Sequence, residues 1–266
     1  MLSLLGIIFI IGMLWVISMS TKKEKWSTPK ADFPKEWRKI LNEDVVYYKS
    51  LSELDKKRFE FKIQEFLLNY KIEGIDVEVN IEDKLLVASS AVIPIFGFPH
   101  WRYHNLQVVQ LYPDRFNEDF QTSGEGRRTL GMVGPGFMEG KMILSKPALY
   151  HGFENESDKK NTAIHEFVHL LDKSDMDIDG IPKALLEKQY SIPWLDLIDK
   201  EIEKIYQDKS DVNPYGGTNK AEFFAVISEY FFERPKLLER KHPELYQLLE
   251  QIFHQDMSKR NLKKFW

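Results

Sequence analysis

The sequence contains no cysteine. This absence excludes disulfide bonds and thiolate ligands for zinc, so any metal ion must be held by histidine, aspartate, glutamate or water. An excess of basic residues is lacking as well, because the formal net charge is −4, and no overall positive field favours binding to nucleic acid. The length of 266 residues indicates one or two domains.

Seven histidines are present, and two of them stand four residues apart in His165-Glu166-Phe-Val-His169. On a helix, residues four apart lie on one face, so both imidazoles can bind one metal ion. Glu166 lies one step round the same edge, where it can reach a metal-bound water but not the ion. This His-Glu-x-x-His pattern predicts two zinc ligands and a general base. The alternative is a core helix with two incidental histidines, and we estimate a chance match at roughly one in a hundred.

The residues around these histidines independently predict a helix. Apolar residues recur at helical spacing, and either of two polar residues can cap the start. The apolar positions are Ile164, Phe167, Val168 and Leu171, and the candidate caps are Asn161 and Thr162.

A nearly unbroken apolar run, Leu2–Met19, opens the chain and is just long enough to cross the hydrocarbon core of a bilayer. No lysine or arginine precedes the run, so a cleaved signal peptide is not favoured. Basic residues follow it, from Lys22 to Lys39, and the positive-inside rule places that side in the cytoplasm. We therefore expect a single-pass anchor in the cytoplasmic (inner) membrane with a cytosolic body; the alternatives are an uncleaved export signal and a buried helix. The predicted divisions are residues 1–20 for the anchor, 21–32 for a linker and 33–266 for the folded domain.

The pattern of the folded part predicts an α+β protein that is mainly helical with a small sheet. A helix is expected near Ser52–Tyr70, where Ser52-Glu-Leu-Asp55 resembles a helix start. Another, buried helix is expected within Lys84–Phe98, ending near Pro94. The expected strands are Leu106–Tyr112 and Lys141–Leu144, and Ile75–Val79 is expected to be a short strand or an edge segment. The glycine-rich segment Gly124–Gly140 is expected to be a loop or a hairpin.

The segment that begins at Asp175, Asp-Met-Asp-Ile-Asp-Gly, imitates the first six positions of a calcium-binding loop. The closing glutamate should occupy the twelfth position, but Leu186 stands there and Glu187 is one place late. Pro182 also lies inside the loop. A solvated acidic loop is therefore the preferred interpretation.

A catalytic zinc ion usually has three protein ligands, and the sequence offers two candidates for the third. Glu222 and Glu229 are seven residues apart on one face of a predicted apolar helix, where a carboxylate requires a partner. Asn219 can cap this helix with Glu222 three residues on, which also fits a capping box. Glu229 can equally be a half-exposed residue or a partner for a basic group. Spacing alone leaves the two glutamates close to equal.

Blocks spread over most of the folded part resemble the Mlc titration factor A family of zinc-dependent peptidases, a gluzincin-like group whose catalytic core is similar to the zinc domain of anthrax lethal factor. The blocks with the two histidines and the two glutamates are specific, and the others are supportive. The N-terminal apolar run departs from the soluble members of that family. The matching blocks are Phe33-Pro-x-x-Trp37-Arg, Tyr112-Pro-Asp-x-Phe116, His165-Glu-Phe-Val-His169-x-Leu-Asp172, Asp179-Gly-Ile-Pro182 and Ala221-Glu222-Phe-Phe-Ala-Val-x-Ser-Glu229-Tyr-Phe-Phe.

The resemblance implies a zincin-like fold in which Glu222 is the third zinc ligand beside His165 and His169. It also implies that Tyr215 assists catalysis by donating a hydrogen bond to the developing oxyanion; the alternative for Tyr215 is a loop aromatic that packs on the body. Glu166 would take a proton from water and pass it to the leaving amine. Asp172 and Glu229 are both candidates to accept the other N–H of a metal-bound histidine, and the sequence does not choose between them.

The expected function is therefore that of a membrane-anchored zinc peptidase that acts on peptides or proteins. The family suggests small peptides or a peptide terminus, which would make it an aminopeptidase. A regulatory protein partner is also expected, and nucleic acid is not. The alternative is a membrane-tethered regulatory binding protein with a structural or vestigial zinc site, which the intact Glu166 disfavours because a structural site needs no base.

Overall fold

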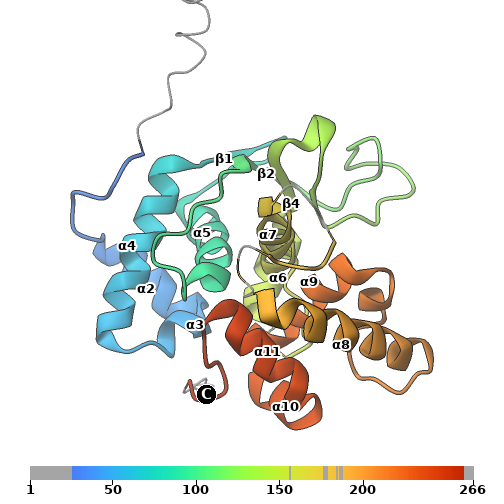
Figure 1. Ribbon diagram of the computed structural model, residues 1–266. Helices are drawn as coiled ribbons and strands as arrows, with labels where there is room; N and C mark the ends of the chain where they lie inside the picture. The colour runs from blue at the N-terminus through green and yellow to red at the C-terminus, as the bar shows by residue number, and fades with distance from the viewer. Residues whose placement is uncertain (1–25, 156, 176–178, 184, 186–187, 261–266) are drawn as a thin grey trace, which may run out of the picture.

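A four-stranded mixed sheet lies at the upper side of the molecule (Figure 1). The computed structural model describes residues 26–260 except 156, 176–178, 184 and 186–187. The order of the strands is β1-β2-β4-β3; β1 and β4 both run parallel to β2, and β3 is antiparallel to β4 at one edge. The strands are β1 (Lys71–Gly74), β2 (Leu106–Tyr112), β3 (Gly131–Val133) and β4 (Gly140–Ser145).

Helices account for most of the remaining described chain and cover one face of the sheet (Figure 1). This confirms an α+β protein that is mainly helical. The helices are α2 (Lys35–Asp44), α3 (Val46–Lys49), α4 (Glu53–Asn69), α5 (Ile81–Ile95), α6 (Lys146–Glu154), α7 (Thr162–Asp172), α8 (Lys188–Tyr206), α9 (Lys220–Glu233), α10 (Pro235–Lys241) and α11 (Pro243–Phe253), with short 3-10 turns η1 (Gly136–Met138), η2 (Lys173–Asp175) and η3 (Pro214–Gly217).

Side chains that alternate between the two faces of the central strands β2 and β4 contribute to two separate hydrophobic clusters. Leu111 and Leu144 point to the main core, which the helices share, whereas Ile143 belongs to a smaller cluster on the other face with Phe116. Successive side chains of a strand point to opposite faces, so this division follows from the two-residue period. The main core surrounds α7 and fixes it beneath the sheet.

The helix starts that local sequence predicts are present. The Ser52 side chain accepts a hydrogen bond from the Asp55 amide and caps α4. Asn161, and not Thr162, caps α7 by accepting from the Ile164 amide. Such caps satisfy amides that have no partner within the helix. The predicted buried helix is α5, in which Pro94 lies within the last turn.

The strand predicted at Ile75–Val79 is wrong, and the first strand lies just before it, at Lys71–Gly74. The chain turns sharply after Gly74, and Asp76 in this turn has a φ of 56°. The turn brings the Val77 carbonyl so close to Gly74 that a side chain at that position would overlap it. The turn removes the following residues from the sheet. The glycine-rich segment Gly124–Gly140 contains β3, which forms a hairpin with β4. Of the two predictions for this segment, a loop or a hairpin, the hairpin is confirmed.

The first described residues lie against the body. The Trp26 indole N–H donates to the Glu65 carboxylate at 2.8 Å, and its ring packs edge-on against Tyr70. The predicted anchor at residues 1–20 and the first part of the predicted linker lie outside the described residues. Within the described part, no helix is both long enough and apolar enough to span a membrane.

Candidate metal centre

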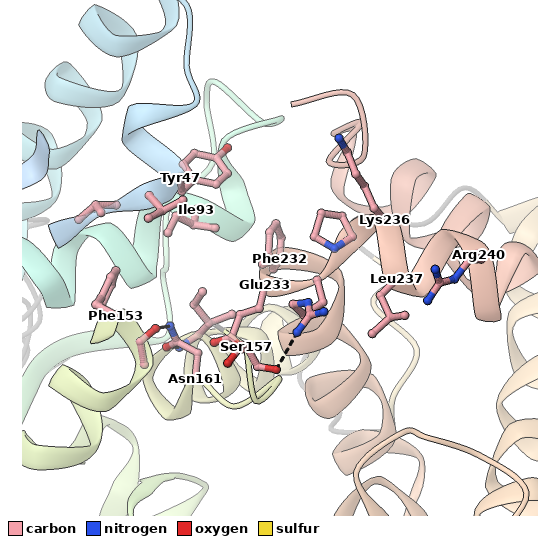
Figure 2. A pocket seen from close by; sticks show the side chains of 16 residues that line it. Tyr47, Ile93, Phe153, Ser157, Asn161, Phe232, Glu233, Lys236, Leu237 and Arg240 are labelled. Atoms are coloured by element: carbon pink, nitrogen blue, oxygen red, sulfur yellow. Dashed lines mark hydrogen bonds between the residues drawn. The ribbon is translucent and has the colours of Figure 1, made fainter. Parts of the chain in front are cut away.

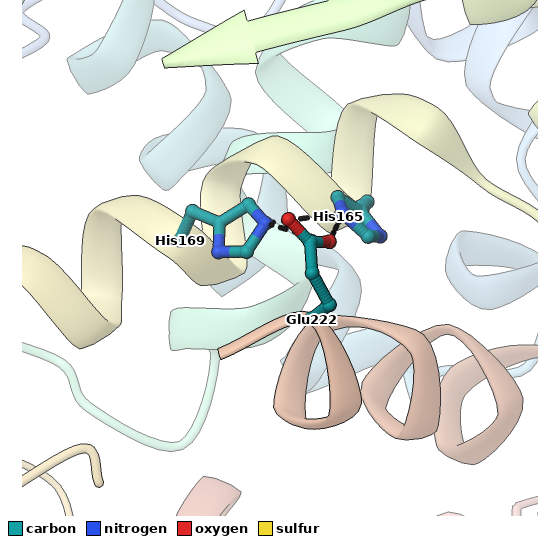
Figure 3. Close-up of side chains that lie close together, drawn as sticks. All are labelled: His165, His169 and Glu222. Carbon is teal, nitrogen blue, oxygen red and sulfur yellow. Dashed lines mark hydrogen bonds and ion pairs between the residues drawn. The ribbon is translucent and has the colours of Figure 1, made fainter. Parts of the chain in front are cut away.

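Two packed helices bring three side chains to one point (Figure 3). His165 and His169 project from α7, and Glu222 projects from the first turn of α9. The Nε2 atoms of the two histidines lie 3.1 Å apart, and the Glu222 Oε2 atom lies 3.0 Å from His165 Nε2 and 3.4 Å from His169 Nε2. The three side chains form a group that can hold a metal ion.

The separations are close to those that a tetrahedral ion requires. Ligands at zinc-to-nitrogen and zinc-to-oxygen distances of about 2.0–2.2 Å and tetrahedral angles stand about 3.3–3.5 Å apart. The observed separations of 3.0–3.4 Å are within a few tenths of an ångström of that range. Three protein ligands leave the fourth tetrahedral position for water or substrate, which is the arrangement of catalytic zinc sites.

The charges at this centre also call for a cation. Glu166 and Glu229 are buried, at 6% exposure each, and Glu222 lies beside them. In the part of the chain that the structure describes, no lysine or arginine pairs with any of the three carboxylates. Buried carboxylates without a cationic partner are costly, so the donor set fits a divalent cation in both geometry and charge.

The same charges act on the protonation of His165. Burial opposes the imidazolium form, but hydrogen bonds to Glu222 and Glu229 outweigh it and raise the pKa of His165 to about 10. The pKa of Glu222 is lowered, because its contacts with His165 and His169 outweigh its burial. Without an ion, a proton on His165 therefore supplies part of the missing positive charge.

Glu222 serves its helix and the centre through different atoms. Its backbone amide donates to the Asn219 side chain at 2.9 Å, which caps α9. Its carboxylate does not return to the Asn219 amide, as a capping box would require, and instead faces the histidines. The cap and the ligand interpretations are therefore compatible.

Glu229 is the carboxylate that orients His165. Its Oε1 atom lies 2.8 Å from His165 Nδ1, and its Oε2 atom accepts from the Asn161 amide at 2.5 Å. Asp172, the other candidate, accepts from the Gly180 amide at 2.9 Å. Carboxylates on the distal nitrogen fix the tautomer and orientation of a ligating histidine, and for His165 this position belongs to Glu229.

Glu166 lies on the same helix, against the edge strand β3. In the described part of the chain it forms no hydrogen bond or ion pair, and burial raises its pKa. A Cβ atom at Gly131 would lie 2.7 Å from both Cγ and Oε1 of Glu166. Gly131 therefore allows β3 to approach the carboxylate closely. Sequence reasoning missed this residue, since it stands among several other glycines of a loop.

Tyr215 lies in η3, immediately before α9, with its ring centroid 6.0 Å from that of His165. The residue is 53% exposed. Partial burial of the phenol and the negative charge of Glu222 raise the pKa of Tyr215 to about 12. The hydroxyl is consequently neutral, and able to donate, throughout the physiological range.

Gly180 ties the end of α7 to the start of α9. Its amide donates to Asp172, and its carbonyl accepts from the Trp194 indole at 2.7 Å. Its φ of 76° favours glycine, and a Cβ atom there would overlap the Lys220 carbonyl at the start of α9. This contact helps to set how far Glu222 stands from the histidines.

The acidic segment before Gly180 is only partly described, since residues 176–178 lie outside the described part. Asp179 accepts from the Ile181 amide and pairs with Lys183 at 3.0 Å. Both of its oxygens thus have partners within the turn. The segment considered as a calcium loop therefore lies partly outside the described residues.

A cavity of about 450 Å³ opens at the metal centre. It reaches from the β3 residue Val133 past His169 to Glu222 and the start of α9, and it includes Asp179. The cavity thus joins His169 and Glu222 to β3, whose outer edge pairs with no further strand among the described residues.

Comparisons with known proteins agree with this geometry. Residues 19–254 match the family described as glucose-regulated metallo-peptidase M90. An uncharacterized protein of Synechocystis is 29% identical over 83% of this chain and 84% of its own length. Proteins named Mlc titration factor A are similar as well: that of Pectobacterium atrosepticum is 32% identical over 62% of this chain and 65% of its own length, and that of Yersinia enterocolitica is 25% identical over 87% and 90%.

These matches confirm the resemblance that the histidine and glutamate blocks suggested. The matched span includes all three members of the group that could hold a metal ion. It begins at residue 19, so the apolar run Leu2–Met19 lies almost entirely outside it. The chain belongs to the M90 family of metallopeptidases.

Proposed function

We propose that this protein hydrolyses peptide bonds with the help of a zinc ion held by His165, His169 and Glu222. The convergence of three ligand atoms within 3.0–3.4 Å of one another carries this proposal. Zinc is favoured because two imidazoles and one carboxylate suit it and because the chain offers no thiolate. When bound, zinc supplies Lewis acidity toward a carbonyl oxygen and a water molecule.

Glu166 acts as the general base and then as the general acid in this proposal. Its carboxylate removes a proton from the attacking water and delivers the proton to the departing amine. Burial raises the pKa of Glu166, which brings its two protonation states closer in free energy at neutral pH. Such matching favours a group that must accept a proton in one step and release it in the next.

Tyr215 and β3 would hold the substrate. The neutral Tyr215 hydroxyl donates a hydrogen bond to the carbonyl oxygen as negative charge develops on it. One edge of β3 pairs with β4, and the sheet continues no further on its other side within the described residues. An extended peptide can add to this free edge by backbone hydrogen bonds, which would lay its scissile bond along α7.

We also propose that the protein is anchored in the cytoplasmic membrane through Leu2–Met19, with its body in the cytosol. The apolar length of the run and the lysines that follow it support this. Fractionation of cells that express the full chain, and of a variant that starts at residue 21, tests the anchor. Equal recovery of both proteins in the soluble fraction would refute it.

Proteins or peptides are the substrate class that the family implies. Two relatives are named for titration of Mlc, and we propose by analogy that this chain also contacts a regulatory protein. Aminopeptidase activity is supported by the family resemblance alone. Paired peptides with free and acetylated amino termini test it, since an aminopeptidase cleaves only the first.

The central test compares the wild-type protein with Glu166→Gln and His169→Ala. Zinc content after dialysis and turnover of a mixed peptide library are measured for each. We expect Glu166→Gln to keep its zinc and lose turnover by about 10²–10⁴-fold, and His169→Ala to lose both. Normal turnover in Glu166→Gln would exclude the general-base role. A zinc-loaded wild type that cleaves no peptide would favour the regulatory binding protein instead.

A further inference from the structure

Another cavity, of about 470 Å³, lies between the N-terminal helices and the C-terminal part of α9 (Figure 2). None of the three metal ligands lines it. Its volume falls in the range of about 300–1,000 Å³ typical of small-molecule sites. The lining residues come from α3, α5, α6, α7, α9, α10 and the loop before α7.

The walls of this cavity combine apolar and polar surface, and the apolar side chains lie on two sides of it. Ile93 and Phe153 lie on one side with the ring of Tyr47, and Phe232 faces them from the other side (Figure 2). Val46 lines the same space from α3. An apolar body of a ligand could therefore be enclosed between two sets of hydrocarbon side chains.

The rim of the cavity is positively charged. It carries the cations Arg234, Lys236 and Arg240 against the single carboxylate of Glu233, whose Oε2 atom accepts from the Lys160 amide at 3.0 Å. Arg234 donates to the Ser157 carbonyl at 3.1 Å. Lys236 and Arg240 are one helical turn apart on α10, and among the described residues neither pairs with a carboxylate. An anion bound at this rim would find cationic side chains that make no ion pair among the described residues.

The floor of the cavity connects to the metal centre. Asn161 lines the cavity and caps α7. The backbone N–H of Asn161 donates to one oxygen of Glu229, and the other oxygen of Glu229 contacts His165 Nδ1. Two hydrogen bonds thus separate a ligand in the cavity from a metal-binding imidazole.

We propose that this cavity is an effector site for a small amphiphilic anion, with an apolar body and a carboxylate, and that its occupancy changes the metal affinity of the centre. The apolar side chains of the walls contact the body, and the cations of α10, Lys236 and Arg240, attract the carboxylate at the rim. The coupling runs through Asn161 and Glu229, because carboxylates that orient ligating histidines affect metal affinity. The effector role rests on the metal centre proposed above, but binding to the cavity does not.

The test of binding uses 4-phenylbutyrate as the probe, with 4-phenylbutylamine as its cationic counterpart. Isothermal titration calorimetry on the full-length chain measures both. We expect one site for the carboxylate with a dissociation constant below about 1 mM, and binding of the amine at least about tenfold weaker. Equal binding of the two compounds would overturn the proposed charge selection.

Matched variants locate the site. Lys236→Glu combined with Arg240→Glu should weaken 4-phenylbutyrate binding at least about tenfold. Lys57→Glu combined with Lys200→Glu makes the same change in net charge at exposed residues outside the cavity and should leave binding unchanged. Val46→Trp fills the cavity without a change in charge and should abolish binding. Full affinity in both the α10 variant and Val46→Trp would overturn the assignment.

The effector role is tested by competition for zinc with a chelator, with and without saturating 4-phenylbutyrate. We expect the zinc dissociation constant to change by about threefold or more, and we expect no change in Val46→Trp. An unchanged zinc affinity at saturation would overturn the coupling. Neither measurement depends on peptide cleavage, so a protein that binds the probe but cleaves nothing would contradict only the proposed peptidase function.

Discussion

Two histidines of this molecule, one buried and one half-buried, each lie between two carboxylates, but their surroundings differ. In each case the two ring nitrogens contact different acidic residues. The first set is His165 with Glu222 and Glu229, and the second is His242 with Asp211 and Glu201.

Lysines complete the second set. Asp211 pairs with Lys241 at 3.1 Å and also contacts Lys159, and Glu201 pairs with Lys204. The carboxylates are thereby neutralised within the protein. The set joins α8, the loop before η3 and the start of α11, so it can be understood as a structural link.

The first set has a second histidine where the second set has lysines. His169 directs its Nε2 atom to the same point as His165 and Glu222, and no lysine or arginine of the described residues pairs with these carboxylates. Residue types alone therefore do not distinguish a metal centre from a structural link. The distinction lies in convergent ligand atoms and in positive charge that the protein itself does not provide.

Removal of one carboxylate from each set should give the largest difference in zinc affinity between the two sets. Glu222→Ala should weaken zinc binding by roughly 10³-fold, since it deletes a ligand, whereas Asp211→Ala should leave zinc affinity unchanged. Chelator competition on both variants measures this. If zinc binding survived in Glu222→Ala, Glu229 would become the candidate ligand.

Loss of the histidine from the second set should reduce stability. His242→Ala should lower the free energy of unfolding by about 2–4 kcal/mol, because the buried Glu201 and the half-buried Asp211 both lose a partner. Zinc content should not change. Denaturant unfolding, with His100→Ala as the control for an exposed histidine, measures the difference.

That stabilisation should depend on pH in a defined window. Burial opposes the charged form of His242, but Glu201 and Asp211 outweigh it and raise its pKa above 6.5, so its contribution is complete below that value and is lost as the pH rises through the raised pKa. The pKa values of Glu201 and Asp211 are lowered, so their contribution is lost only in acid. The difference between wild type and His242→Ala should be greatest between about pH 4.5 and 6.5. A difference that stays constant with pH would contradict this assignment.

Glu229→Gln tests whether orientation of His165 matters for the metal. Zinc affinity should fall by about 10–100-fold and no further, since the three ligands remain. Glu233→Gln is the matched control, because Glu233 lies one turn later on α9 and accepts from the Lys160 amide. An equal loss of zinc affinity in both variants would indicate a general effect on the start of α7.

Gly131→Ala should have the smallest effect and should act on turnover alone. The added methyl group would displace Glu166, and we expect turnover to fall about tenfold with zinc affinity unchanged. Gly134→Ala is the control, since a Cβ atom there meets only Met138 at an ordinary 3.7 Å. Unchanged turnover in Gly131→Ala would show that the base tolerates displacement.

Local signals in the sequence predicted much of this structure. The caps at Ser52 and Asn161, the strand Leu106–Tyr112 and the helix before Pro94 all depend on neighbouring residues, so they could be predicted from them. The first strand was misplaced because its partner, β2, lies more than thirty residues away and the turn after Gly74 is set by that pairing.

The centre was predicted in part. The spacing of His165 and His169 specifies a shared helix face, but spacing could not choose between Asp172 and Glu229, because that choice depends on how α9 packs against α7. The effector cavity had no signal in the sequence, since its walls come from segments up to 195 residues apart, from Val45 to Arg240. Only the packing of these segments brings them together.

The position of Gly180 has a consequence for the recognition of related enzymes. Its backbone conformation and its contact with Lys220 help to keep α9 at its observed distance from α7. A relative with a bulky residue there could retain every letter of the histidine motif and the distant glutamate, and still hold no ion. Inventories of metallopeptidases that count motifs alone would include such inactive proteins.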